Sequence, residues 1–161
     1  MNSIIFIDIL DQIFQRLSSV FMYTLPLKAS LPFGDYFFNK YYFLSTLIEP
    51  ITLPIKIIEK SLPLGSFLLF ILLFAGLVRN PKVPYFVRYN TCQALLIDIA
   101  LIIITYLLTI LPIFELGSII SILGSIIFIF TLSIFIYSIF QCIYGVEPEI
   151  PLISKSVRMQ I

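Results

Sequence analysis

Asp98 is the residue whose type and position point most directly to chemistry. It is the only charged residue between positions 89 and 114, in a run dominated by Ile and Leu. An ionised carboxylate at the centre of a bilayer costs about 2.5–3.5 kcal/mol on insertion scales. Asp98 must therefore face protein or water, or take up a proton. Two roles are open for it: hydrogen bonding to another helix, or coupling to the movement of an ion.

Other polar residues share the helix that the sequence predicts around Asp98. Thr91, Asp98, Thr105 and Thr109 fall on one helical stripe, and Asn90 and Gln93 lie near its start. We expect this stripe to pack against other helices through interhelical hydrogen bonds, worth about 0.6 kcal/mol each. A polar seam lining a pathway is the alternative. Arg88 lies ten residues from Asp98, about 15 Å along a helix, too far for an easy ion pair.

The residue inventory argues against catalysis. The chain has no His, and its two cysteines, Cys92 and Cys142, form no metal-binding cluster. Intramembrane hydrolysis needs paired aspartates, a Ser–His pair or zinc ligands, and one intramembrane Asp supplies none of these. We therefore predict no catalytic residue, no metal site, no cofactor and no enzymatic activity. Both thiols are expected to be free, with a disulfide between them as the minor alternative.

Composition identifies the class. Of the 161 residues, 60% are hydrophobic and only 12% are charged, with a mean hydropathy of +1.07, whereas soluble domains average about 25% charged residues. The sequence predicts an all-α, polytopic membrane protein that forms a single membrane domain over residues 1–161. The net charge of +1 gives no reason to expect nucleic acid as a partner.

Charged residues divide the apolar runs into four predicted membrane-spanning helices. These lie near residues 13–31, 63–79, 88–111 and 117–144. The first is the weakest, since only eleven uncharged residues separate Arg16 from Lys28, and a helix lying in the interface is the alternative. Pro26 is expected to bend or end this helix. The fourth carries small and polar residues near one face, which favours close helix packing: Gly117, Ser121, Gly124, Thr131, Ser138 and Cys142.

Three segments are predicted to lie at the membrane surface. Residues 4–16 have amphipathic spacing, and residues 32–43 have the aromatic and turn residues of a loop at headgroup depth. In residues 45–62, an isoleucine-rich face opposes Lys56, Glu59 and Lys60, and Pro50 and Pro54 predict a broken helix.

Basic residues predict the orientation. The loop between the second and third spans carries Arg79, Lys82 and Arg88 and no acid, whereas the loop at 111–117 carries Glu115 and no cation. By the positive-inside rule, the basic loop and both termini face the cytoplasm-equivalent side. The N-terminal segment, with Asp8 and Asp11, has neither a secretory signal pattern nor that of a transit peptide.

The stretch "VRNPKVPYFVRYNTCQALLIDI", residues 78–99, resembles the signature of the twenty-kilodalton subunit family of Tic, the translocon at the inner envelope membrane of chloroplasts. A looser match, "RLSSVFMYTLPLKASLPFG", is similar to the first span of that family. Pro81 and Lys28 depart from the family pattern. The positions that match the signature are Val78, Arg79, Asn80, Val83, Phe86, Arg88, Tyr89, Asn90, Gln93, Ala94, Leu96, Asp98 and Ile99.

The resemblance implies a core subunit of the import translocon, with four helices and stromal termini, that helps preproteins cross the inner envelope. Implied partners are other Tic subunits, translocating preproteins and membrane lipids, with homo-oligomers as a further possibility. A plastid-encoded member of the red-algal type is expected, or else a cyanobacterial membrane protein. A small-solute or ion transporter and a non-conducting membrane scaffold are the alternatives. The candidate functional positions are Arg79, Asn80, Arg88, Asn90, Gln93 and Asp98.

Overall fold

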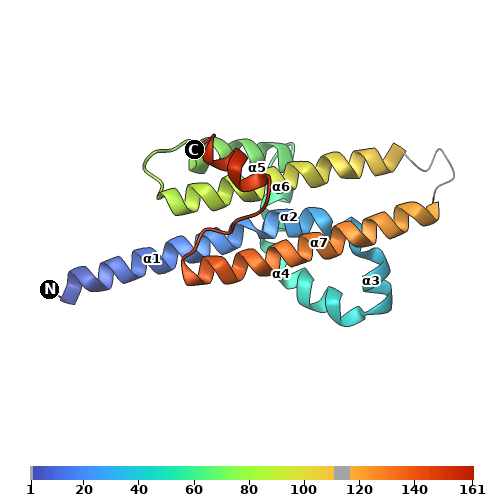
Figure 1. Cartoon of the computed structure of the whole chain (residues 1–161), viewed down its shortest axis with the longest axis horizontal. Coiled ribbons are helices and arrows are strands. Elements are labelled where there is room, and N and C mark those ends of the chain that lie inside the picture. The colour runs from blue at the N-terminus through green and yellow to red at the C-terminus, as the bar shows by residue number, and fades with distance from the viewer. Residues whose placement is uncertain (1, 111–116) are drawn as a thin grey trace.

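Two long antiparallel helices, α6 (Tyr85–Ile110) and α7 (Gly117–Tyr144), form the frame of the molecule (Figure 1). The computed structural model describes residues 2–110 and 117–161, so the loop predicted at 111–117 lies almost wholly outside the described residues. Within these ranges, α6 and residues Ile119–Tyr144 of α7 are each long and apolar enough to cross a membrane. Neither helix contains Pro, which lets the backbone hydrogen bonding run unbroken. The all-α polytopic fold class predicted from composition is confirmed.

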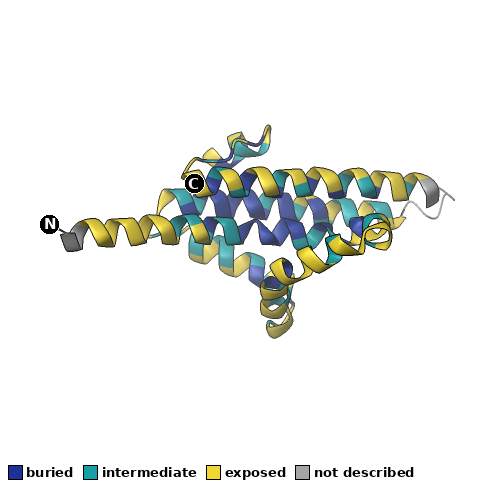
Figure 2. Ribbon diagram, turned by 90° about the horizontal axis from the view of Figure 1, so that it is seen from below, coloured by how far each residue is buried: buried dark blue, intermediate teal, exposed yellow. Residues whose placement is uncertain are grey.

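The first apolar segment forms two helices with a break at Tyr23. Helix α1 covers Asn2–Met22 and helix α2 covers Thr24–Ser30. Pro26 explains the break, because it has no N–H to donate to the carbonyl of Met22 and its ring crowds that carbonyl. The first half of α1 extends beyond the bundle, and its residues 5–14 are exposed, whereas α2 is largely buried (Figure 2).

The loop predicted over residues 32–43 is wrong, because this segment is helical. A 3-10 helix, η1 (Leu31–Gly34), leads directly into α3 (Asp35–Lys40). Two aromatic side chains of α3 hold it against α7: Phe37 stacks on Phe128 at 5.8 Å between ring centroids, and Phe38 meets the same ring edge-on at 5.2 Å. The aromatic residues that suggested headgroup depth therefore serve in part as packing residues.

The predicted interruption at Pro50 and Pro54 is also wrong, since α4 runs continuously over Tyr42–Ser61. Both prolines are exposed, so their rings disturb no packing. The buried face of α4 is formed by Ile48, Thr52 and Ile55, and the Thr52 hydroxyl donates to the carbonyls of Ile48 and Glu49 at 3.2 Å. Packing along this face compensates for the two missing backbone donors.

Helix α4 meets the next helix at a sharp turn. Helix α5 (Ser66–Leu73) continues as a π-helix, η2 (Phe74–Val78), and the axis bends by 100° between α4 and this pair. The turn uses Leu64 and Gly65, both with positive φ. If the bent pair counts as one span, the described residues contain up to three candidate spans. The four-span arrangement therefore stays a prediction.

The core lies where α2, the first half of α6 and the second half of α7 meet (Figure 2). Ser121 is exposed, and nothing is described of the surroundings of Gly117. After α7 the chain turns back at Gly145 and ends in the short helix α8 (Ile153–Arg158), which packs on α6 (Figure 1). The buried positions of α7 alternate at spacings of three and four residues, which confirms close packing of one face: Gly124, Phe128, Thr131, Phe135, Ser138 and Cys142.

Candidate functional site

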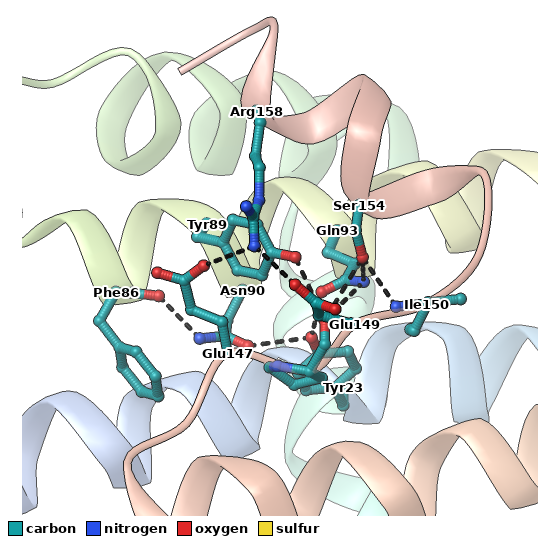
Figure 3. Close-up of polar contacts among 11 residues, drawn as sticks. Tyr23, Phe86, Tyr89, Asn90, Gln93, Glu147, Glu149, Ile150, Ser154 and Arg158 are labelled. Atoms are coloured by element: carbon teal, nitrogen blue, oxygen red, sulfur yellow. Dashed lines mark hydrogen bonds and ion pairs between the residues drawn. The ribbon is translucent and has the colours of Figure 1, made fainter.

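A buried polar network lies at the start of α6, in the segment 89–93 (Figure 3). The Tyr23 hydroxyl approaches Oδ1 of Asn90 at 3.0 Å and Oε1 of Gln93 at 2.9 Å. All three residues are fully buried. Because one hydroxyl proton serves two acceptors, the hydrogen bond is shared between them. Tyr23 thereby links the break between α1 and α2 to α6.

The amide nitrogens of this network point away from Tyr23. Nδ2 of Asn90 donates to the carbonyl of Phe86 at 2.7 Å, one turn earlier on α6. Nε2 of Gln93 donates to the carbonyl of Pro148 at 3.2 Å and to Oγ of Ser154 at 3.0 Å. The orientation of both amides follows from these partners. Gln93 of α6 thus connects Tyr23, at the break between α1 and α2, to the segment after α7.

The C-terminal segment is held to α6 by polar contacts as well as by packing. Ser154 receives the backbone N–H of Ile150 at 2.7 Å, and the Tyr89 hydroxyl donates to the carbonyl of Pro148 at 3.2 Å (Figure 3). Val157 of α8 is fully buried. Since buried polar groups are costly when unpaired, these bonds fix the segment after Gly145 in one position.

Arg158 of α8 contacts two carboxylates of this segment and the Tyr89 ring of α6. Its guanidinium lies 2.9 Å from a carboxylate oxygen of Glu149 and 3.4 Å from one of Glu147, and it stands 5.9 Å from the centroid of the Tyr89 ring. The neighbouring Tyr89 side chain, and then the two carboxylates, raise the pKa of Arg158 above its ordinary value. The group is half exposed, so each pair contributes little to stability.

The basic loop before α6 is a compact turn. Oδ1 of Asn80 accepts the backbone N–H of Lys82 at 3.0 Å, and Nε of Arg88 donates to the carbonyl of Val78 at 2.9 Å. Arg88 therefore ties α6 to the end of η2, while Lys82 and Arg79 remain exposed. The Arg79 guanidinium lies 5.4 Å from the centre of the Phe74 ring.

Asp98 lies on the opposite half of α6 from the network. It is 7% exposed and has no hydrogen-bond or ion-pair partner among residues 5–110 and 119–161. The charged groups whose fields reach it are Lys28 and Glu59, which pair with each other at 2.7 Å across α2 and α4. Glu59 was expected opposite the apolar face of its helix. It instead turns towards the bundle, where Lys28 compensates its charge.

The predicted polar stripe of α6 is buried only in its first half. Thr91 and Asp98 are buried, whereas Thr105 is half-buried and Thr109 is exposed. The hydroxyls of Thr105 and Thr109 donate to backbone carbonyls one turn earlier, both at 2.8 Å. The Thr91 hydroxyl is buried without a hydrogen-bond partner among the described residues, and Asp98 has none there either. The interhelical hydrogen bonds expected along this stripe are therefore absent at all four positions within the described residues. The second half of α6 has fewer neighbours because the bundle is closed mainly around α2.

Both thiols are buried and free. Sγ of Cys142 lies 3.3 Å from Oδ1 of Asn90, and Sγ of Cys92 lies 3.7 Å from Oε1 of Gln160. Within the described ranges, no group of three or more His, Cys, Asp or Glu side chains is placed to hold a metal ion.

Sequence reasoning identified Asn90, Gln93 and Asp98 but missed the partners that complete the network. Tyr23 stood in the looser motif and was not singled out, although a Tyr before a Pro in an apolar run is a potential buried donor. Nothing singled out Pro148 and Ser154. The one available signal was the charge pattern of the C-terminal segment, in which two acids, Glu147 and Glu149, precede two bases, Lys155 and Arg158.

This structure is a bundle of apolar helices with a polar network at one end and a buried carboxylate in the other half of α6. It is the structure of a polytopic helical membrane protein. Residues 10–157 match the family described as chloroplast import apparatus, Tic20-like. The chain belongs to this family, which confirms the resemblance seen in residues 78–99.

Three relatives are consistent with this membership. A Tic20 family protein of Synechocystis is 32% identical over 150 residues, covering 91% of this chain and 92% of the relative. The protein TIC 20-v, chloroplastic, of Arabidopsis thaliana is 32% identical over 148 residues, covering 91% and 70%. The Arabidopsis protein TIC 20-II, chloroplastic, is 39% identical over 87 residues, covering 54% of this chain and 41% of the relative.

Proposed function

We propose that this chain is a core membrane subunit of the protein-import translocon of the chloroplast inner envelope, where it helps preproteins cross into the stroma. It acts as a translocon component and not as an enzyme. Its partners are other Tic subunits, the preproteins and the surrounding lipids. The membership of residues 10–157 in the chloroplast import family supports this assignment.

One observation carries the proposal beyond family membership. The segment with the family signature is also the part of the chain that joins the bundle together. From it, Asn90 and Gln93 bond to Tyr23 before α2, and Gln93 also reaches Pro148 beyond α7. We infer that Asn90 and Gln93 hold the bundle in shape, that Arg79 and Arg88 act at the stromal surface, and that Asn80 shapes the turn between them.

The proposed topology has four spans, near residues 13–31, 63–79, 88–111 and 117–144, with both termini and the basic loop on the stromal side. Two contacts support a common end for these segments. Arg16 of α1 donates to the carbonyl of Ile143 at 2.9 Å, and Tyr89 at the start of α6 donates to Pro148. Exposed Arg79 and Lys82 suit an anionic leaflet, where each is worth about 1 kcal/mol.

Neither alternative function gains a specific observation. In secondary transporters, substrate sites are typically formed by discontinuous helices, whereas α6 is continuous from Tyr85 to Ile110 around Asp98. One copy with so few helices cannot enclose a polypeptide-wide path, so further copies or other subunits must complete it.

Site-specific photocrosslinking tests the proposal. A preprotein arrested during import is expected to crosslink to probes at exposed positions of α6, such as Ile103 and Leu107. A probe at Met159, exposed on the C-terminal segment, serves as the comparison on the stromal side. If no probe along the chain captures the arrested preprotein while the chain is assembled in its complex, the chain is not part of the path.

A further inference from the structure

A cavity of about 500 Å³ lies between α5 and the second half of α6, and Asp98 forms part of its wall. We call it the Asp98 hollow. Its remaining walls are mainly apolar and aromatic, and they include Leu64, Phe67, Phe70, Ile102 and Tyr106. A mostly apolar cavity of this size with one polar group is typical of a binding site.

The carboxylate of Asp98 has no partner of its own in the described chain. It is more than nine-tenths buried, and the ammonium of Lys28 is engaged by both oxygens of Glu59 at 2.7 Å. The Lys28 ammonium, whose field reaches Asp98, is therefore already paired with another carboxylate. An unpaired buried charge is costly, and a cation entering the hollow would compensate it.

The walls favour one kind of cation. A guanidinium stacks on aromatic faces and is more weakly hydrated than an ammonium, and Phe67, Phe70 and Tyr106 supply such faces beside the carboxylate. Chloroplast transit peptides are rich in Arg and Ser and poor in acidic residues. We propose that the Asp98 hollow receives an arginine side chain of a preprotein in transit, an inference that rests on the proposed function.

The position of the hollow suits this role. It lies in the half of α6 remote from the basic loop, beside Ser66 and Leu64 at the start of α5. In the proposed topology that half is nearer the intermembrane space, from which preproteins arrive. Phe67 and Tyr106 are 62% and 70% exposed, so the hollow opens sideways and can admit a side chain without threading.

Binding of a synthetic peptide tests the inference directly. The full chain is reconstituted in nanodiscs, and the Kd of a fluorescent transit peptide containing arginines is measured by anisotropy. Asp98→Asn should weaken binding about tenfold, as for other close charge pairs. Asp11→Asn, which removes an exposed carboxylate of α1, should leave the Kd unchanged. The peptide with Gln at each Arg should bind the original chain and Asp98→Asn equally.

Equal affinity of the arginine peptide for the original chain and Asp98→Asn would overturn the inference. The inference would also be overturned if Asp98→Asn weakened binding of the glutamine peptide as much as that of the arginine peptide. The effect of Asp98 would then not depend on arginine, and the hollow would hold a lipid chain or serve packing alone. If Asp98→Asn fails to accumulate, the peptide series on the unaltered chain still decides, since replacing Arg by Gln must weaken binding.

A probe at Phe67 separates this inference from the proposed function. A photoreactive phenylalanine analogue there should capture an arrested preprotein, and capture should fall when arginines of the preprotein are replaced by glutamine. Capture at Ile103 or Leu107 but not at Phe67 would refute the arginine site and leave the translocon role intact. Capture at no position would refute both.

Discussion

The hydroxyl of Tyr23 lies 2.9 Å from Oε1 of Gln93, although the two residues are seventy positions apart in the chain. The contact joins the backbone break that Pro26 imposes to the motif at the start of α6. Both side chains are fully buried, so water cannot replace the bond. A local irregularity in one helix is thereby used to bring a donor to two amide oxygens of another.

Tyr23→Phe should lower the stability of the bundle by about 1–3 kcal/mol, because two buried amide oxygens lose their shared donor. The unfolding temperature can be followed with a thiol-reactive dye, since Cys92 and Cys142 are both buried and become reactive on unfolding. Tyr42→Phe is the matched control, as the Tyr42 ring is 81% exposed. An equal unfolding temperature for Tyr23→Phe and the original chain would show that the network contributes nothing.

Ser154→Ala should loosen the C-terminal segment without unfolding the helices. The hydroxyl accepts the N–H of Ile150 and the amide of Gln93. Its loss leaves the Ile150 N–H without this acceptor and leaves Gln93 with the carbonyl of Pro148 alone. Trypsin should then cleave more rapidly after Lys155 and Arg158, as seen by mass spectrometry of the released peptides. Ser156→Ala is the control, because Ser156 donates only to the carbonyl of Leu152 within its own turn. Indistinguishable cleavage rates would contradict a role for Ser154.

Much of the fold was predictable from the distribution of charge and hydropathy. Helices α6 and α7 follow from two long apolar runs. The first run contains one charged residue, Asp98, and the second contains none. The small-residue face of α7 followed from helical periodicity and is buried at Gly124, Thr131 and Ser138. These features depend on local sequence, which a periodic pattern records.

The errors arose where tertiary contacts override local signals. Pro50 and Pro54 were expected to break α4, yet both face outwards and packing by Ile48, Thr52 and Ile55 preserves the helix. Glu59 turns inwards because it pairs with Lys28 of α2. The two residues are 31 positions apart in the chain, so no local sequence pattern encodes their contact. In the same way, the network around Gln93 needs residues from three distant segments, so only its α6 members were predictable.

Lys28→Met should destabilise the chain by about 3 kcal/mol, because Glu59 is left as an uncompensated, largely buried charge. The side chains of the pair retain 23% and 14% exposure, which keeps the effect at the lower end for buried pairs. The double variant Lys28→Met with Glu59→Gln should recover most of the loss. The dye-based unfolding temperature measures all three chains, and failure of the double variant to recover would show that Lys28 acts through other contacts.

Cysteine accessibility tests the topology. In a background with Cys92 and Cys142 replaced, Lys40→Cys and Lys82→Cys place one thiol each at exposed lysine positions. Because these positions lie on opposite sides in the four-span arrangement, a membrane-impermeant maleimide should label only one of them in sealed vesicles. Detergent should make both reactive, which controls for local burial. Labelling of both in sealed vesicles would refute the arrangement.

Two glycine substitutions should have opposite effects. Gly145 has φ +74°, and a Cβ there would lie 2.9 Å from Nη2 of Arg16. Gly145→Ala should therefore cost about 1–2 kcal/mol for the left-handed backbone and further disturb the bond from Arg16 to the carbonyl of Ile143. Gly76, within η2, has nothing within 4 Å of its would-be Cβ. Gly76→Ala should be neutral or stabilising by up to about 1 kcal/mol.

The unfolding temperatures of these two variants, measured side by side, check the argument. Adding Arg16→Met to Gly145→Ala should cost little more than Gly145→Ala alone, since the bond is already disturbed. Arg16→Met alone should destabilise the chain, because the carbonyl at the end of α7 loses its cation. Full additivity of the two changes would mean that Arg16 and Gly145 act independently and that their close approach does not matter to the fold.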